Sequence, residues 1–184
     1  MRWESLEASL ALVLTLHLAI WPPWVVAASP AIGTIVPQGA FRLNQASLLN
    51  DATLFEGATI ETGTATSRMD LVSGTRLELS SDSRGRFFDH HLVLERGQSI
   101  LRKAQGFRVE ARGLTILPDT RASTGRVLLP GNTRVQVSAA TGSFRVLNSR
   151  GMVVVRISSG KALVIEPQPS EGRVEFASVA LDIL

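Results

Sequence analysis

The sequence contains no cysteine and no tyrosine, and only two of its 19 basic residues, Lys103 and Lys161, are lysines. Without cysteine the chain cannot form disulfides, thiolate zinc sites, iron–sulfur clusters or a cysteine nucleophile. Few groups titrate in the alkaline range, so the sequence pI of about 10.5 overstates the net charge of +3. The chain has 184 residues, of which 45% are hydrophobic and 19% charged, as expected for one folded domain with a leader.

A clustered stripe of basic residues is also missing. Arginines alternate with acids along the chain, as in Asp82, Arg84, Arg86 and Asp89. Nucleic-acid-binding proteins usually gather their basic residues on one face or along one helix. The charge pattern therefore disfavours nucleic acid as a partner.

The first 28 residues are expected to form a hydrophobic leader helix. Residues 10–20 are apolar apart from one threonine and one histidine, and two prolines and the small residues Val26 and Ala28 follow. This pattern predicts a signal peptide cut before Ser29. An uncleaved membrane anchor is the alternative, because residues 10–28 come close to the roughly 20 apolar residues that span a bilayer. Either reading predicts an exported protein, periplasmic or otherwise extracytoplasmic, with an inner-membrane anchor if the leader is retained.

Residues 29–184 show the two-residue alternation of half-buried strands and no convincing helical stripe. Glycine-containing turns recur between the strands about every 8–12 residues, which is typical of all-β domains. We therefore predict an all-β domain of short strands, either a β-solenoid or roll or a sandwich-like fold. The clearest expected strands are Phe41–Leu43, Thr59–Thr62, Met69–Leu71, Arg76–Leu79, His91–Glu95, Phe107–Glu110, Arg134–Val137, Phe144–Val146, Met152–Val155 and Lys161–Ile165.

A faint internal repeat relates residues 68–80 to residues 126–138. At an offset of 58, an arginine, a leucine, a threonine, a second arginine and a serine coincide. Stacked β units produce such self-similarity, whereas chance matches between strands of similar composition are the alternative. If the units are equivalent, Leu77 and Leu79 point into the core, as do Val135 and Val137.

Residues 54–101 resemble the FecR-like domain family, with the best match over 33–112 and a weaker second β unit over 126–166. The family pattern has three parts, which are L-x-x-G-x-x-I-x-T, L-x-x-G-T-x-L-x-L and L-x-L-x-x-G. The matching residues are Leu54, Gly57, Ile60 and Thr62, then Leu71, Gly74, Thr75, Leu77 and Leu79, and finally Leu92, Leu94 and Gly97. These residues are glycines, threonines and apolar side chains, so the motif specifies a fold and contains no chemistry.

The resemblance implies an extracytoplasmic β-rich domain, which is often described as a solenoid or roll. Founding members of the family pass the occupancy of an outer-membrane receptor to a cytoplasmic sigma factor. From the resemblance we expect the β domain alone, without a counterpart of their sigma-binding segment or of their receptor-docking module. The resemblance therefore carries over the domain and leaves a part in sigma-factor signalling open.

Four arginines are the candidate binding residues. Arg68 and Arg126 occupy matching positions in the repeat, and so do Arg76 and Arg134. If the two copies stack, these side chains would form a row that binds an acidic protein, an anionic glycan or a lipid headgroup. A solvated outer face with interspersed acids is the competing interpretation.

Other polar groups are weaker candidates for chemistry. His90 and His91 are adjacent, so on a strand they point to opposite faces and cannot both ligate one metal. The polar segment Ser80–Ser83 lacks the G-x-S-x-G pattern of a nucleophile elbow. Carboxylates such as Glu56 and Glu61 are spread singly along strands instead of forming a catalytic pair. The sequence therefore predicts no enzyme, no cofactor and no metal site.

We expect an exported β domain that works by binding another envelope protein, in signalling or in envelope assembly. The alternative is a cell-wall or surface-glycan binding module. Glycan-binding platforms usually contain exposed aromatic rings, and the chain after residue 28 has no tyrosine or tryptophan. The protein partner is therefore the leading expectation.

Overall fold

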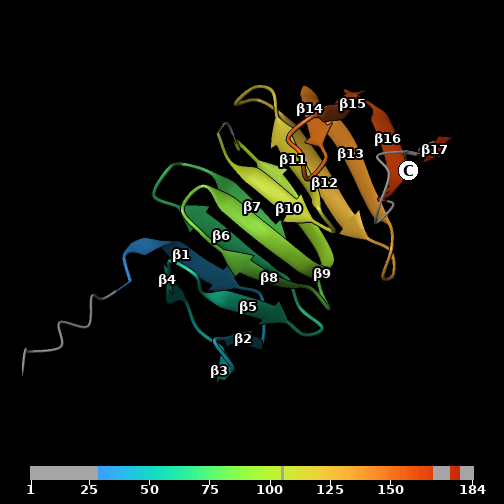
Figure 1. Cartoon of the computed structure of the whole chain (residues 1–184). Helices are drawn as coiled ribbons and strands as arrows, with labels where there is room; N and C mark the ends of the chain where they lie inside the picture. The colour runs from blue at the N-terminus through green and yellow to red at the C-terminus, as the bar shows by residue number, and fades with distance from the viewer. Residues whose placement is uncertain (1–28, 105, 168–174, 179–184) are drawn as a thin grey trace, which may run out of the picture.

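The domain consists of β-strands, and no helix occurs in the part of the chain that the structure describes (Figure 1). The computed structural model describes residues 29–104, 106–167 and 175–178. The predicted leader lies outside these ranges. Within them, no helix is long and apolar enough to cross a membrane. The all-β prediction is confirmed.

In the described part of the chain, seventeen strands form two open sheets that share one long strand, β9 (His91–Arg102). The first half of β9 belongs to sheet B and the second half to sheet A. Sheet A has the order β4 (Ala52–Phe55), β1 (Ala31–Pro37), β6 (Ser67–Leu71), β7 (Arg76–Leu79), β9, β12 (Thr124–Leu129), β13 (Val135–Thr141), β16 (Lys161–Glu166) and β17 (Glu175–Ser178). Sheet B has the order β3 (Ala46–Leu48), β2 (Phe41–Leu43), β5 (Thr59–Thr62), β8 (Arg84–Phe87), β9, β10 (Arg108–Ala111), β11 (Leu114–Pro118), β14 (Ser143–Leu147) and β15 (Val153–Ser158).

The chain moves back and forth between the two sheets. After β9 it adds the hairpin β10–β11 to sheet B, β12–β13 to sheet A, β14–β15 to sheet B and β16–β17 to sheet A. The pairing of β9 with β10 is parallel, and the other pairings are antiparallel. Each new hairpin therefore extends the sheet to which an earlier hairpin already belongs.

Inward-pointing side chains of both sheets form one hydrophobic core. Leu77 and Leu79 reach it from sheet A, and Phe87, Leu92 and Leu94 reach it from sheet B. All the leucines and the isoleucine of the family pattern are buried, and so are its two threonines. The pattern therefore consists mainly of core positions, as its composition predicted.

Two sheet crossings are built in the same way, with a left-handed glycine placed against a buried serine. β9 crosses between the sheets at Gly97, which has a φ of +82° and lies against Ser83. The chain passes from β13 to β14 at Gly142, which has a φ of +71° and lies against Ser123. Each serine hydroxyl donates to the carbonyl of the residue after the glycine, at 3.2 Å in both cases.

The alternation of inward- and outward-pointing side chains along β9 shifts by one residue at its crossing. Leu92 and Leu94 are buried before it, and Ser99 and Leu101 are buried after it, so the buried positions change from even to odd numbers. A bulge causes the change, because Arg84 pairs with Arg96 while the next residue of β8 pairs with Leu94. Gly97 therefore lies within a strand, whereas the dipeptide Arg96-Gly97 in the sequence predicts a turn.

The repeated segments lie in two hairpins of sheet A, β6–β7 and β12–β13, but they are not equivalent units. Their inward faces correspond, since Leu77, Leu79, Val135 and Val137 are all buried as predicted. However, β6 and β12 run in opposite directions, because three antiparallel pairings separate them. The register also differs by two residues, which leaves Arg134 in the turn before β13. The prediction of stacked equivalent copies is therefore wrong.

Candidate functional site: an arginine-rich outer face of sheet B

Seven arginines project from the outer face of sheet B, opposite to the core. They come from β2, β8, β9, β10, β14 and β15, where the neighbouring residues on each strand are mostly buried. We call this surface the sheet B arginine face. It comprises Arg42, Arg84, Arg86, Arg96, Arg108, Arg145 and Arg156. Four carboxylates, those of Glu61, Glu95, Glu110 and Asp119, form ion pairs with them, and a fifth, that of Asp82, lies beside Arg96.

Strand register brings several of these charges into one line. Ser47, Arg42, Glu61, Arg84 and Arg96 lie directly opposite one another on five successive strands. Adjacent strands are about 4.8 Å apart, so the line extends roughly 19 Å across the sheet. A partner with regularly spaced anionic groups could contact several of these guanidinium groups at once.

Most of the arginines on this face share a carboxylate with a second arginine. Glu95 lies 2.9 Å from Arg84 and 3.6 Å from Arg86. Asp119 in turn accepts from Arg145 at 2.6 Å and contacts Arg156 at 3.3 Å. Each such group of three side chains has a net charge of +1. Because an arginine has five N–H donors and uses few of them here, many donors remain for a ligand.

The arginines contribute little to stability, because they stay largely in contact with water. The six that form ion pairs have side-chain exposures between 40% and 64%. Exposed ion pairs typically contribute about 0.2–1 kcal/mol. Arg42 forms no ion pair with any residue that the structure describes. The face therefore has charge available for binding.

The carboxylate of Asp119 is contacted by three side chains, those of Ser143, Arg145 and Arg156. Burial alone would raise the pKa of its carboxyl, but hydrogen bonds from Ser143 and Arg145 outweigh that effect. Together with the charge of Arg156, they hold the pKa of Asp119 below its ordinary value. This carboxylate fixes two arginines near the end of the face.

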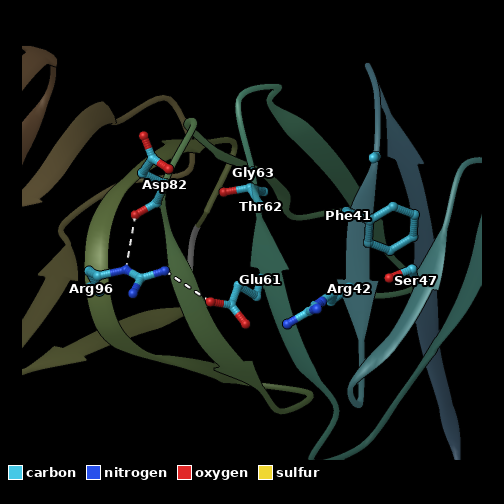
Figure 2. A pocket seen from close by; sticks show the side chains of 9 residues that line it. Phe41, Arg42, Ser47, Glu61, Thr62, Gly63, Asp82 and Arg96 are labelled. Atoms are coloured by element: carbon cyan, nitrogen blue, oxygen red, sulfur yellow. Dashed lines mark hydrogen bonds and ion pairs between the residues drawn. The ribbon is translucent and has the colours of Figure 1, made fainter.

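An open pocket lies at the other end of the face, lined by residues of β2, β3, β5 and β9 and of the neighbouring turns (Figure 2). Its volume is about 320 Å³. Arg96 donates to Glu61 at 2.9 Å and to the carbonyl oxygen of Asp82 at 3.3 Å, and Arg42 approaches Glu61 from the opposite side (Figure 2). Two arginines and two carboxylates line this pocket, so its charges balance. Glu61 and the carbonyl oxygen of Asp82 hold Arg96 in place, and the balanced charges give the pocket no net preference for anions.

The arginines singled out from the sequence lie elsewhere. Arg68, Arg76 and Arg126 project from the outer face of sheet A, and Arg134 lies in a turn. Arg68 and Arg126 share one cross-strand row, but Glu78 and Ile100 lie between them. Asp70 contacts Arg68 at 3.3 Å and Arg76 at 3.0 Å. The four residues therefore do not form the continuous row that the repeat suggested.

The remaining polar candidates have structural surroundings. His90 contacts the carboxylate of Asp89 at 3.0 Å, whereas the ring of His91 stacks on Phe88. Burial lowers the pKa of His91, and the charge of Glu110 opposes that effect. No group of three or more metal-ligating side chains occurs within the described ranges. Ser83 is fully buried against Gly97, so it belongs to the crossing described above.

The sheet B arginine face could be found only in part from the sequence. The segment Arg84–Phe87 alternates arginine with a glycine and a phenylalanine. A run this short, with one apolar side chain, gives only a weak strand signal in the sequence. Alternation indicates which residues of one strand face outward. It does not reveal which strands are neighbours, and neighbouring strands are what place these arginines together.

Comparisons with known proteins show similarity at the level of the fold. No protein-family model and no curated protein matches the sequence. Two crystal structures of a putative anti-sigma factor from Parabacteroides distasonis match with a TM-score of 0.51 and 15% identity. The match covers 65% of this chain and 59% of that chain. The similarity therefore extends to the β fold of part of that protein.

Proposed function

We propose that the chain is an exported, non-enzymatic β domain that binds another protein of the cell envelope through the sheet B arginine face. The observation that carries the proposal is the excess of seven arginines over five carboxylates on one face of sheet B. Arginine is favoured at interfaces because its planar group binds carboxylates in a bidentate manner. An acidic surface on the partner is the complement that this face requires.

The FecR-like resemblance supports the same proposal. Most of the matched pattern residues are core positions of two sheets between which the chain repeatedly crosses, and this arrangement is compatible with the β-roll that the resemblance implies. The fold similarity to a putative anti-sigma factor is compatible with a role in envelope signalling. Envelope assembly is the other role in which a domain of this kind would bind a neighbouring protein.

Capture from envelope extracts tests the proposed face. The chain is immobilised, and retained material is compared between the unmodified protein and a variant with Arg84→Glu and Arg86→Glu. Both side chains are about half exposed, so charge reversal should leave the fold intact. We expect retention to fall at least about tenfold in the variant. Added salt should weaken capture by the unmodified protein, because it screens exposed charges.

A matched control reverses two arginines on the other sheet. Arg68→Glu with Arg126→Glu changes the net charge by the same amount on the outer face of sheet A. Equal loss of retention in both double variants would show that only net charge matters, and the proposed face would be refuted. If capture persists after protease digestion of the extract, the ligand is a glycan or lipid, and the cell-wall or surface-glycan alternative replaces the protein partner.

Export has a separate test. The proposal requires that substitution of Leu14 and Leu16 by Arg blocks export, because each charge at an apolar helix centre costs about 2.5–3.5 kcal/mol on insertion. Cell fractionation measures the outcome, and recovery of the unmodified protein in the cytoplasm would contradict export. Mass spectrometry of the exported form distinguishes a leader cut near Ser29 from a retained anchor that still begins at Met1.

A further inference from the structure

A second basic site lies at the end of sheet A, away from the sheet B arginine face. Three turns meet there, namely the β6–β7 turn, the turn after β9 and the turn between β11 and β12. They border an open pocket of about 460 Å³, which we call the three-turn pocket. It is lined by Ser73, Gly74, Lys103, Arg121 and Ala122.

The three-turn pocket has positive charge and no acid in its lining. Lys103 and Arg121 both line it, and neither forms an ion pair with any residue in the described part of the chain. Arg76 and Arg102 lie directly opposite each other on the two strands that lead into these turns. Asp70 contacts Arg76 on the sheet, which leaves Arg102 without a carboxylate among the described residues. The local charge is therefore uncompensated, in contrast with the balanced pocket beside Glu61.

Buried residues anchor all three turns. Thr75 is 2% exposed and accepts a hydrogen bond from the hydroxyl of Ser73 at 3.2 Å. Ala104 is completely buried directly after Lys103, and Ser123 is completely buried two residues after Arg121. The backbone positions of the two cations are therefore fixed, while their side chains remain at the surface. Such preorganisation lowers the entropic cost of binding a ligand between them.

We propose that the three-turn pocket binds a phosphate group, either as the free ion or as the headgroup of an anionic lipid. The lysine ammonium and the arginine guanidinium beside one cavity are the donors that phosphate oxygens accept from, with the arginine able to donate twice. The volume exceeds that of a bare phosphate, so a phosphate ester also has room. This site is independent of the sheet B arginine face, and its occupancy does not require a protein partner.

Phosphate binding is measured by thermal unfolding of the protein as recovered from cells, with inorganic phosphate added at constant ionic strength. At ten times the Kd we expect Tm to rise by about 3–6 °C, because a ligand that binds only the folded state stabilises it by mass action. Sedimentation with vesicles of phosphatidylglycerol in phosphatidylcholine, compared with phosphatidylcholine alone, tests the lipid source. Response to phosphate assigns the free ion, and response only to the anionic vesicles assigns the headgroup.

The decisive variant replaces both cations, as Lys103→Ala with Arg121→Ala. We expect it to weaken binding of either probe at least about tenfold, since each charge-assisted hydrogen bond adds substantially to affinity. The control removes one lysine and one arginine elsewhere, as Lys161→Ala with Arg150→Ala, and should bind normally. Should the decisive variant unfold, the single change Arg121→Gln on its exposed turn provides the same comparison. Absence of binding to both probes, or equal loss in the decisive and control variants, would overturn the proposal.

Discussion

Substitution of Gly97 by alanine should destabilise the domain far more than the same change at Gly74. Both glycines have almost the same left-handed backbone, with φ values of +82° and +81°. The conformational cost for an alanine is therefore the same at both sites, at about 1–2 kcal/mol. The two sites differ in space. A Cβ at Gly74 would meet nothing within 4 Å, whereas a Cβ at Gly97 would lie 2.6 Å from the Cα of Ser83.

The additional cost at Gly97 can be estimated from what has to move. The close atom belongs to the backbone of a completely buried residue, so no flexible side chain can give way. Forced overpacking of this kind costs about 1–3 kcal/mol. Displacement of Ser83 also strains its hydrogen bonds with Gln98, at 2.9 and 3.2 Å, and each typically contributes about 0.5–1.5 kcal/mol. We expect a loss of about 3–5 kcal/mol for Gly97→Ala and about 1–2 kcal/mol for Gly74→Ala.

Urea unfolding followed by far-ultraviolet circular dichroism measures both values, with m-values compared to confirm two-state behaviour. Gly142→Ala provides a second comparison, because a Cβ there would lie 2.9 Å from the Cα of Ser123. It should behave like Gly97→Ala. If all three variants lose similar stability, the contact between glycine and serine has no energetic role, and the account of the sheet crossings would be refuted.

Three further predictions concern the core, an acid and the leader. Leu79→Ala should cost roughly 2–4 kcal/mol because Leu79 is completely buried, whereas Arg76→Ala should cost at most about 0.5 kcal/mol, both measured by urea unfolding. Asp119→Asn should lower stability at neutral pH, and the difference should begin to shrink once the pH falls below about 4. Folding lowers the pKa of Asp119, so its contribution is fully present above the unfolded pKa and is lost as the pH falls through the lower folded pKa. Substitution of Leu14 and Leu16 by arginine should leave the protein in the cytoplasmic fraction.

The faces of individual strands could be predicted from the sequence because alternation is a local property. The alternation in the expected strand His91–Glu95 places Leu92 and Leu94 on one face, and both are buried. The bulge at Glu95 was not predictable in the same way. It depends on how β8 pairs with β9, and it shifts the buried positions to Ser99 and Leu101 further along the same strand. The full length of β9 was missed for this reason.

The candidate site was missed because it is a property of strand order. Arg42 and Arg96 are 54 positions apart in the sequence, yet they belong to one line of residues across sheet B. The sequence repeat pointed instead to Arg68 and Arg126, which do lie in one row of sheet A. Their separation by Glu78 and Ile100 follows from the insertion of β9 between the two hairpins. Only the pairing of β9 with both β7 and β12 decides this arrangement.

The feature that recurs in the structure is the pairing of glycine with serine at a crossing, and its sequence spacing explains why a fixed-offset comparison does not find it. Ser83 precedes Gly97 by 14 residues, whereas Ser123 precedes Gly142 by 19. The geometry requires only that a buried hydroxyl meets the chain where it turns with a positive φ. The strands between the two residues can differ in length without changing that contact. Energetic equivalence of the two crossings therefore does not require equal spacing. Similar losses of stability in Gly97→Ala and Gly142→Ala would be the physical evidence that the two glycine–serine contacts have the same role.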